Sequence, residues 1–438
     1  MSDKSHLVPD TSTSGRVLEF DFPGLEIGVA QYAEGPTGAT VFRFVDKAVG
    51  AVDVRGGAPG AYNVDWLRWG YGWPNLDALV VSGGSWYGLA ASGGVAGALK
   101  EDGHRSGHWA NLAHVAGAII YDFGQRRPNE IHPDEKLGAE ALRAAKAGRF
   151  PQGANGAGRM TMQGSYFGLW LHSGQGGAFR QVGETKIACF AVVNSVGAVA
   201  DRDGRLRFGN QTIPTGESGI RDLVELVPKD VETVDGSILG ERRSSVPPSA
   251  QNTTISLVVT NRKLEYAELQ RLAVQVHTSM GRAIQPFGTL NDGDVLFAAS
   301  TGEVDSSNLH PTDLGTVASE VMWDAILASV PDVPDASMTA SGLSLPPDPT
   351  EVVGRYSFGN ELSMDVGVAE GRLTLTNTGG RDIFGVRPGE SLAALSDREA
   401  LCTTQSLFLP AFGFAGNDSR RRLVLNPGPW QQAGTATR

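Results

Sequence analysis

The stretch Ala250-Gln-Asn-Thr-Thr-Ile-Ser-Leu-Val-Val-Thr-Asn261 follows the proline-rich run Ser244-Ser-Val-Pro-Pro-Ser249. Its apolar residues alternate as in a strand with one buried face: Ile255, Leu257 and Val259. Cleavage between Asn252 and Thr253 would leave Thr253 as an N-terminus at the start of this strand. Its hydroxyl would then be a nucleophile, and its α-amine, with a pKa of about 7.7–8.0, a base at neutral pH. Threonines are also common strand formers, so the stretch alone leaves both interpretations open.

The composition is that of a globular protein with many turns. The chain has 438 residues, a formal net charge of −11 and 19% charged residues, and its length favours two or three domains. It carries no basic cluster, so we expect no nucleic-acid partner. No apolar run is long enough to span a bilayer, and Met1-Ser-Asp-Lys-Ser-His6 does not resemble a secretory signal, so we expect a cytoplasmic protein without a membrane partner.

The chain divides by composition into four parts. Residues 1–16 are polar, and we expect them to be flexible. Residues 17–330 alternate short β-branched runs with glycine turns and helices, and we expect one α/β core there. Residues 331–350 contain five prolines and are typical of a linker. Residues 351–438 show period-two strands separated by turns, which predicts a small antiparallel β domain, curled or barrel-like.

Glycine-rich motifs precede the Asn-Thr junction, and none is a nucleotide site by its pattern. They are Val54-Arg-Gly-Gly-Ala-Pro-Gly60, Ser82-Gly-Gly-Ser-Trp-Tyr-Gly-Leu-Ala90, Asn155-Gly-Ala-Gly158 and Val193-Asn-Ser-Val-Gly197. None has the Lys-Ser/Thr ending of a phosphate loop or the spacing of a dinucleotide fingerprint. The histidines His104, His108 and His114 lack a carboxylate or cysteine partner at zinc-ligand spacing. We therefore expect no metal and no other cofactor.

The order of these motifs around the junction resembles the self-cleaving amidases that include D-stereospecific aminopeptidases, β-aminopeptidases and nylon-oligomer endohydrolases. The resemblance covers about residues 20 to 330. It is carried by Val54-Arg-Gly-Gly-Ala-Pro-Gly60 with Asp65, Gly83-Gly-Ser85 with Gly88-Leu-Ala90, Ile120-Tyr-Asp122, His132-Pro-Asp134, Asn252-Thr-Thr254 and Asp292-Gly-Asp294. Each motif alone is weak, and their common order is specific.

The resemblance implies a four-layer αββα fold of the N-terminal-nucleophile type, cut after Asn252 into portions 17–252 and 253–330. It implies hydrolysis of small peptides or amide oligomers through an acyl-Thr253 intermediate, in a homo-oligomer, a tetramer of cleaved protomers. The roles it assigns are as follows: Thr253 as nucleophile, Asn194 as oxyanion donor, Asp292 and Asp294 beside the nucleophile, and Tyr121 and Ser85 at the substrate.

One departure from the family pattern leaves alternatives open. Where relatives carry Lys-Gly-Gly, this chain has His172-Ser-Gly174. His172 is a candidate catalytic residue, although an imidazole with a pKa near ~6.5 is mostly neutral at pH 7. An acyltransferase of the ornithine acetyltransferase type, or a non-catalytic binding protein with a degenerate site, are the alternatives.

The C-terminal part resembles the lipocalin-like domain appended to some serine β-lactamase-like hydrolases. Typical relatives of the amidase core lack it. Its role stays open between a cleft cover, a wall on the substrate side and an oligomer contact. We expect a chain that ends near Val330 to cleave itself without it.

Overall fold

The computed structural model describes most of the chain. The described residues are 7–69, 72, 74–103, 111–123, 126–127, 130–211, 219–223, 252–305, 309–332, 348–358, 362–379, 386, 388–389, 391–393, 395–398, 401–403, 411–415, 421–426 and 430–437. The proline-rich run 244–249 and most of the expected linker, 333–347, lie outside them. The same holds for residues 1–6.

The core is built on one long, bent sheet whose strands follow the order β11-β12-β14-β16-β3-β5-β6-β4, with β2 paired to β3 and β7 paired to β2. The pairs β14–β16 and β5–β6 are parallel, and the other pairs along this order are antiparallel. The strands are β2 (Leu25–Tyr32), β3 (Thr37–Val54), β4 (Ala61–Tyr62), β5 (Asn75–Ser82), β6 (Val115–Ile119), β7 (Lys146–Ala147), β11 (Gln175–Val182), β12 (Thr185–Val192), β14 (Ile255–Arg262) and β16 (Val295–Val304).

Strand β3 turns this sheet into two layers. Its first half pairs with β2, and its second half pairs with β16, with an irregular register toward β5 between Arg43 and Ala48. The largest apolar cluster lies between the layers and contains Phe42, Phe190, Leu257 and Phe297. Burial of such side chains is worth about 1.5–3 kcal/mol each, so this inter-sheet cluster is a major source of the core's stability.

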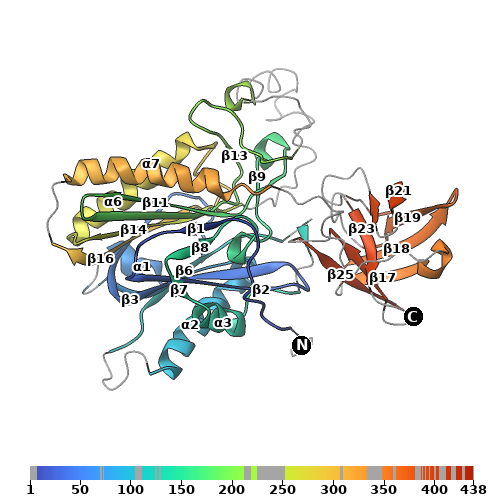
Figure 1. The fold of residues 1–438 in the computed structure, drawn as a ribbon, viewed down its shortest axis with the longest axis horizontal. Coiled ribbons are helices and arrows are strands. Elements are labelled where there is room, and N and C mark those ends of the chain that lie inside the picture. The colour runs from blue at the N-terminus through green and yellow to red at the C-terminus, as the bar shows by residue number, and fades with distance from the viewer. Residues whose placement is uncertain are drawn as a thin grey trace.

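Helices cover both outer faces (Figure 1). On one face α2 (Ala90–Glu101) and α3 (Glu135–Arg143) pack on the layer that contains β2 and β5. On the other, α6 (Tyr266–Ser279) and α7 (Pro311–Ser329) pack on β11, β12, β16 and the second half of β3. The predicted four-layer αββα architecture is therefore confirmed.

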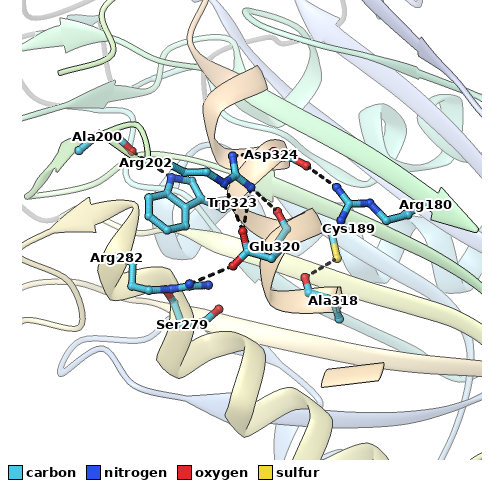
Figure 2. Close-up of polar contacts among 10 residues, drawn as sticks. All are labelled: Arg180, Cys189, Ala200, Arg202, Ser279, Arg282, Ala318, Glu320, Trp323 and Asp324. Atoms are coloured by element: carbon cyan, nitrogen blue, oxygen red, sulfur yellow. Dashed lines mark hydrogen bonds and ion pairs between the residues drawn. The ribbon is translucent and has the colours of Figure 1, made fainter. Parts of the chain in front are cut away.

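The outer face of α7 is held by an ion-pair cluster (Figure 2). The Arg202 and Arg282 guanidiniums both bind Glu320 and lie over the ring of Trp323, 5.1 and 4.8 Å from its centroid. Arg202 and Arg180 also pair with Asp324. Exposed pairs contribute little one by one, but this network fixes α7 against the strands below it.

Short elements complete the core. They are β1 (Val17–Glu19), β8 (Arg149–Pro151), β9 (Met162–Gln163), β10 (Leu171–His172), β13 (Ala198–Val199), β15 (Ile284–Gln285), α1 (Val64–Trp69), and the 3-10 turns η1 (Ser85–Leu89), η3 (Gly156–Gly158), η4 (Ser165–Phe167) and η5 (Met280–Arg282). Ahead of β1, the segment expected to be flexible runs along the core from residue 7 to residue 16. Leu7 is buried there, and Asp10 forms a bridge with Gln31.

The C-terminal part folds as a nine-stranded antiparallel sheet in the order β20-β19-β18-β17-β25-β24-β23-β22-β21, preceded by the turn η6 (Pro349–Val352). Strand β19 also lies against β21, so the sheet curls toward a barrel, as predicted. The strands are β17 (Gly354–Phe358), β18 (Leu362–Ala369), β19 (Arg372–Asn377), β20 (Ser391–Ala393), β21 (Leu395–Arg398), β22 (Leu401–Thr403), β23 (Ala411–Ala415), β24 (Arg422–Leu425) and β25 (Gln432–Ala436).

Candidate active site

The Asn252–Thr253 peptide bond lies just before β14, at the centre of the core. Thr253 is only 2% exposed, and its Oγ1 donates to the carbonyl oxygen of Asn252 at 2.6 Å. The backbone N–H of Gly293 donates to the same oxygen at 2.8 Å. The N–H of Thr253 donates to the carbonyl of Asn194 at 2.5 Å. A hydroxyl and a hydrogen-bond donor therefore both face the carbonyl that precedes Thr253.

The Asp292-Gly293-Asp294 turn packs directly against Thr253. A Cβ added at Gly293 would lie 2.6 Å from Thr253 Oγ1, so only glycine allows this close approach. Asp294 accepts hydrogen bonds from the N–H of Thr254 at 2.7 Å and of Gly288 at 3.0 Å. The backbone of this turn thus reaches Thr253, and the Asp294 carboxylate binds the N–H of the next residue, Thr254.

Burial shifts the acid–base behaviour of both aspartates. It raises the pKa of the Asp292 carboxyl above its usual value, although hydrogen bonds from Thr289 oppose the shift. Burial, together with the nearby charge of Asp292, raises the pKa of Asp294 well above its usual value. Two neighbouring buried carboxylates resist ionising together, so this turn favours a protonated carboxyl more than an exposed aspartate would.

The glycine motif at residues 54–60 supports this turn through its backbone. The N–H groups of Arg55 and Gly56 donate to the carbonyl of Asp294, both at 3.1 Å, and that of Ala58 donates to the carbonyl of Asp292 at 2.9 Å. A Cβ at Gly56 would lie 2.2 Å from the Asp294 nitrogen. The backbone of residues 55–58 therefore binds the Asp-Gly-Asp turn directly, which explains why the two motifs occur together.

Asn194 is held at the junction by a buried arginine. Arg126 donates to Asn194 Oδ1 at 2.6 Å and to Asn252 Oδ1 at 3.0 Å. The Asn194 Nδ2 donates to the carbonyl of Tyr121 at 3.0 Å, which Arg126 also contacts at 2.9 Å. Burial lowers the pKa of Arg126 to about 10, so the guanidinium stays charged at neutral pH.

His172 lies close to this arginine but does not provide a positive charge. Burial and the charge of Arg126 lower the pKa of His172 to about 4, so its imidazole is neutral at pH 7. Its ring stacks on Trp430 of the C-terminal domain, with centroids 3.8 Å apart and planes 20° apart. The positive charge beside the junction therefore belongs to Arg126 and not to His172.

Tyr121 and Ser85 lie at the same end of the neighbouring strands. The N–H of Ser85 donates to the carbonyl of Ile120 at 3.0 Å, directly before Tyr121. The Tyr121 ring packs edge-on against Phe123, with centroids 6.0 Å apart. Through its carbonyl, Tyr121 is joined to Asn194 and so to the junction.

Comparisons with known proteins identify the family. The profile of peptidase family S58 matches residues 20–340. The chain belongs to peptidase family S58. It is a hydrolase that acts on amide bonds, as the sequence predicted.

Relatives of this S58 peptidase include proteins named endohydrolases and proteins named aminopeptidases. A 6-aminohexanoate-oligomer endohydrolase of Paenarthrobacter ureafaciens is 42% identical over 74% of this chain and 89% of its own. An uncharacterized aminopeptidase of Mycobacterium leprae is 33% identical over 67% of this chain and 82% of its own. The solved structure of a Burkholderia sp. beta-aminopeptidase shares the fold, with a TM-score of 0.52, 18% identity, and coverage of 73% of this chain and 87% of that one.

Three residues that contact the Asn252–Thr253 junction escaped the sequence analysis. Arg126 stands in Gly124-Gln-Arg-Arg-Pro128, which has the composition of an exposed turn. Ser165 accepts from Asn252 Nδ2 at 2.6 Å, and no motif marks it. Gly293 was quoted only as a spacer between two aspartates. The one available signal for Arg126 was a pair of arginines inside an otherwise uncharged stretch.

A cavity of about 560 Å³ lies elsewhere, lined by Asp10, Arg16, Gln31, Arg159, Pro331 and Trp430 among others. Thr253, Asp292 and Asp294 do not line it. His104 and His108 fall outside the described residues, and within the described part of the chain no three His, Cys, Asp or Glu side chains gather as for a metal ion. No helix in the described ranges has the length and apolar character needed to cross a membrane.

Proposed function

We propose that the chain cuts itself between Asn252 and Thr253, and that the freed Thr253 then hydrolyses amide bonds of small substrates. The observation that supports this proposal is that the carbonyl oxygen of Asn252 accepts two hydrogen bonds, one from the Thr253 hydroxyl and one from the Gly293 N–H. The Thr253 hydroxyl lies 2.6 Å from its oxygen, and the Gly293 N–H, at 2.8 Å, points at the same atom. A donor already in place where negative charge develops is what acyl transfer requires.

Self-cleavage proceeds by an acyl shift. Thr253 Oγ1 attacks the carbonyl carbon of Asn252, and the Gly293 N–H stabilises the oxyanion. The C–N bond breaks, the hydroxyl proton passes to the leaving nitrogen, and an ester joins Asn252 to Thr253. Water then hydrolyses this ester and leaves Asn252 with a carboxylate and Thr253 with a free α-amine.

The mature site repeats the same chemistry on a substrate. The α-amine of Thr253 takes the hydroxyl proton and the hydroxyl oxygen attacks the carbonyl carbon of the substrate amide. The C–N bond then breaks, the leaving amine takes that proton, and water hydrolyses the acyl-Thr253 ester to release the carboxylic acid. Asn194 is proposed as an oxyanion donor, the Asp292 and Asp294 pair orients the amine and hydroxyl, and Tyr121 with Ser85 lines the substrate cleft. Arg126 is proposed to hold Asn194 in place.

The substrate class is proposed from the relatives. Oligomers of 6-aminohexanoate come first, because the 42% identical relative bears that name and covers most of this core. Short peptides with a free N-terminus come second, since a 33% identical relative is named an aminopeptidase. We also propose that cleaved protomers assemble into a homo-oligomer, a tetramer, which light scattering after size exclusion would measure.

Intact mass of the purified protein tests the proposal. We expect two fragments of 252 and 186 residues, the second beginning Thr-Thr-Ile-Ser-Leu. Thr253→Ala should stay a single inactive chain of 438 residues, whereas Thr253→Ser should retain part of both reactions. An active wild type that remains uncut would refute the proposal. Transfer of the acyl group to an added amine in preference to water would favour an acyltransferase.

A further inference from the structure

The C-terminal β domain reaches the active site through two buried side chains. In Figure 1, β25 is the strand of that domain nearest to the core. Gln432, at its start, is 1% exposed and donates from Nε2 to the backbone carbonyl of Arg126 at 2.9 Å. Trp430, two residues earlier and 5% exposed, stacks on His172.

Both contacts converge on the residues that hold the scissile junction. The Arg126 guanidinium binds the side chains of Asn194 and Asn252, so the position of its backbone decides where those two asparagines are held. His172 faces Arg126 closely enough for its charge to act on the imidazole. The backbone N–H of His172 donates to Gln211 Oε1 at 2.7 Å, and Trp430 stacks on the imidazole ring.

Gln432 makes its hydrogen bond to Arg126 with only one end of its side-chain amide. Its Oε1 is buried and has no hydrogen-bond partner within the described part of the chain, as is also true of Trp430 Nε1. A buried polar atom left unpaired costs about 1–3 kcal/mol. Methionine would fill the same space without that loss, but it could not donate to Arg126.

We propose that the C-terminal β domain is a positioning module of the active site, and that Gln432 and Trp430 hold Arg126 and His172 in the arrangement needed for self-cleavage and turnover. This inference rests on the proposed function. It replaces the expectation that a chain ending near Val330 cleaves itself.

Four full-length variants test it: Gln432→Met, Trp430→Ala, Trp430→Phe and, as a matched control on the exposed side of β25, Thr435→Ala. We measure the rate of self-cleavage by intact mass, kcat and KM on a 6-aminohexanoate oligomer, and the midpoint of thermal unfolding. Gln432→Met should slow self-cleavage and lower kcat about three- to tenfold, the size of one hydrogen bond, with KM little changed and the midpoint not lowered. Trp430→Ala should lower both rates by at least as much, Trp430→Phe should recover them, and Thr435→Ala should match wild type.

The outcomes separate the two proposals. Wild-type rates in both Gln432→Met and Trp430→Ala would overturn the positioning role, as would a rise in KM alone, which would indicate a substrate wall. If Gln432→Met unfolds the domain, the comparison of Trp430→Ala with Trp430→Phe decides the matter by itself. A wild-type protein that never cleaves and shows no amidase activity would refute the proposed function instead.

Discussion

Arg126 binds the side chains of both Asn194 and Asn252. It is a buried cation, and its charge acts on the nearby imidazole of His172. Burying a guanidinium is costly unless its donors are satisfied, and here side-chain and backbone oxygens accept them. The positive charge beside the Asn252–Thr253 bond is thus supplied by Arg126, which lies far from that bond in the sequence.

Replacing Arg126 should impair maturation more than folding. In Arg126→Met, Asn194 and Asn252 lose a charged donor worth about 1.5–3 kcal/mol, which corresponds to roughly 10- to 150-fold slower self-cleavage. Arg126→Lys should fall in between. The control is Arg180→Met, because Arg180 is a half-exposed arginine paired with Asp324 on the surface. Intact mass over time measures the rates, and equal rates in Arg126→Met and wild type would contradict the role.

The raised pKa of Asp294 makes stability depend on pH. Because the folded-state pKa lies above the unfolded value of about 3.9, the folded chain holds the proton more tightly. The resulting stabilisation is full below the unfolded pKa and is lost as pH rises through the folded pKa. An asparagine at position 294 cannot ionise, so it does not lose stabilisation as pH rises.

We therefore compare the melting temperature of Asp294→Asn with that of the same chain without this substitution. The difference should shift in favour of Asp294→Asn as pH rises from about 4 to about 8. Both chains should carry Thr253→Ala, so that they stay uncut. Asp305→Asn is the control, because Asp305 is exposed and pairs only with Lys263 at the surface in the described structure. Melting curves at several pH values measure the difference, and a constant difference between the two chains would argue against a raised pKa.

At the scale of elements, glycines set how closely α2 and α3 approach. A Cβ at Gly138 would lie 2.1 Å from the carbonyl oxygen of Ala91, and one at Gly94 would lie 2.0 Å from that of Glu135. The small residues of α2 therefore permit backbone contact between the two helices. By contrast, Gly97 is exposed on α2 and a Cβ there would meet nothing within 4 Å.

Alanine at position 138 and alanine at position 97 should change the free energy of unfolding in opposite directions. Gly138→Ala forces the helices apart and should destabilise the core by about 1–3 kcal/mol. Gly97→Ala only improves helix propensity and should stabilise by about 0.5–1 kcal/mol. Denaturant unfolding of the full chain measures both. A shift of the same sign in both variants would show that close packing of α2 on α3 is not limiting.

At the scale of the whole molecule, a cut after Asn252 would give two fragments whose strands pair with each other in one sheet. Strand β14 of the second fragment pairs with β12 of the first, and β16 of the second pairs with β3 of the first. Neither fragment has a complete sheet without the other. The inter-sheet cluster likewise draws on both, with Phe42 and Phe190 from the first and Leu257 and Phe297 from the second.

The two fragments should therefore stay together after cleavage. We expect them to elute as one species in native buffer, at the volume of uncut Thr253→Ala, and to unfold in one cooperative transition. They should separate only in denaturing guanidinium chloride. Recovery of either fragment alone from a native column would contradict this arrangement of strands.

The sequence by itself determined the αββα fold, the amide-hydrolase class and the candidate nucleophile Thr253 with its Asp-Gly-Asp partner. The fold, the class and the candidate residues follow from the resemblance to self-cleaving amidases. Short motifs carry that resemblance, and periodicity by itself predicts only the strand that follows Thr253. Gly56 and Gly293 belong to such motifs, and the structure explains why each must be glycine.

Only the tertiary structure decided which cation faces the junction and what the C-terminal domain contacts. The bond between Gln432 and Arg126 joins positions 306 residues apart, and the stack of Trp430 on His172 crosses from one domain to another. Local periodicity records which face of an element is buried, but not which distant element buries it. An arginine in a glycine- and proline-flanked turn therefore has the pattern of a surface residue until the fold encloses it.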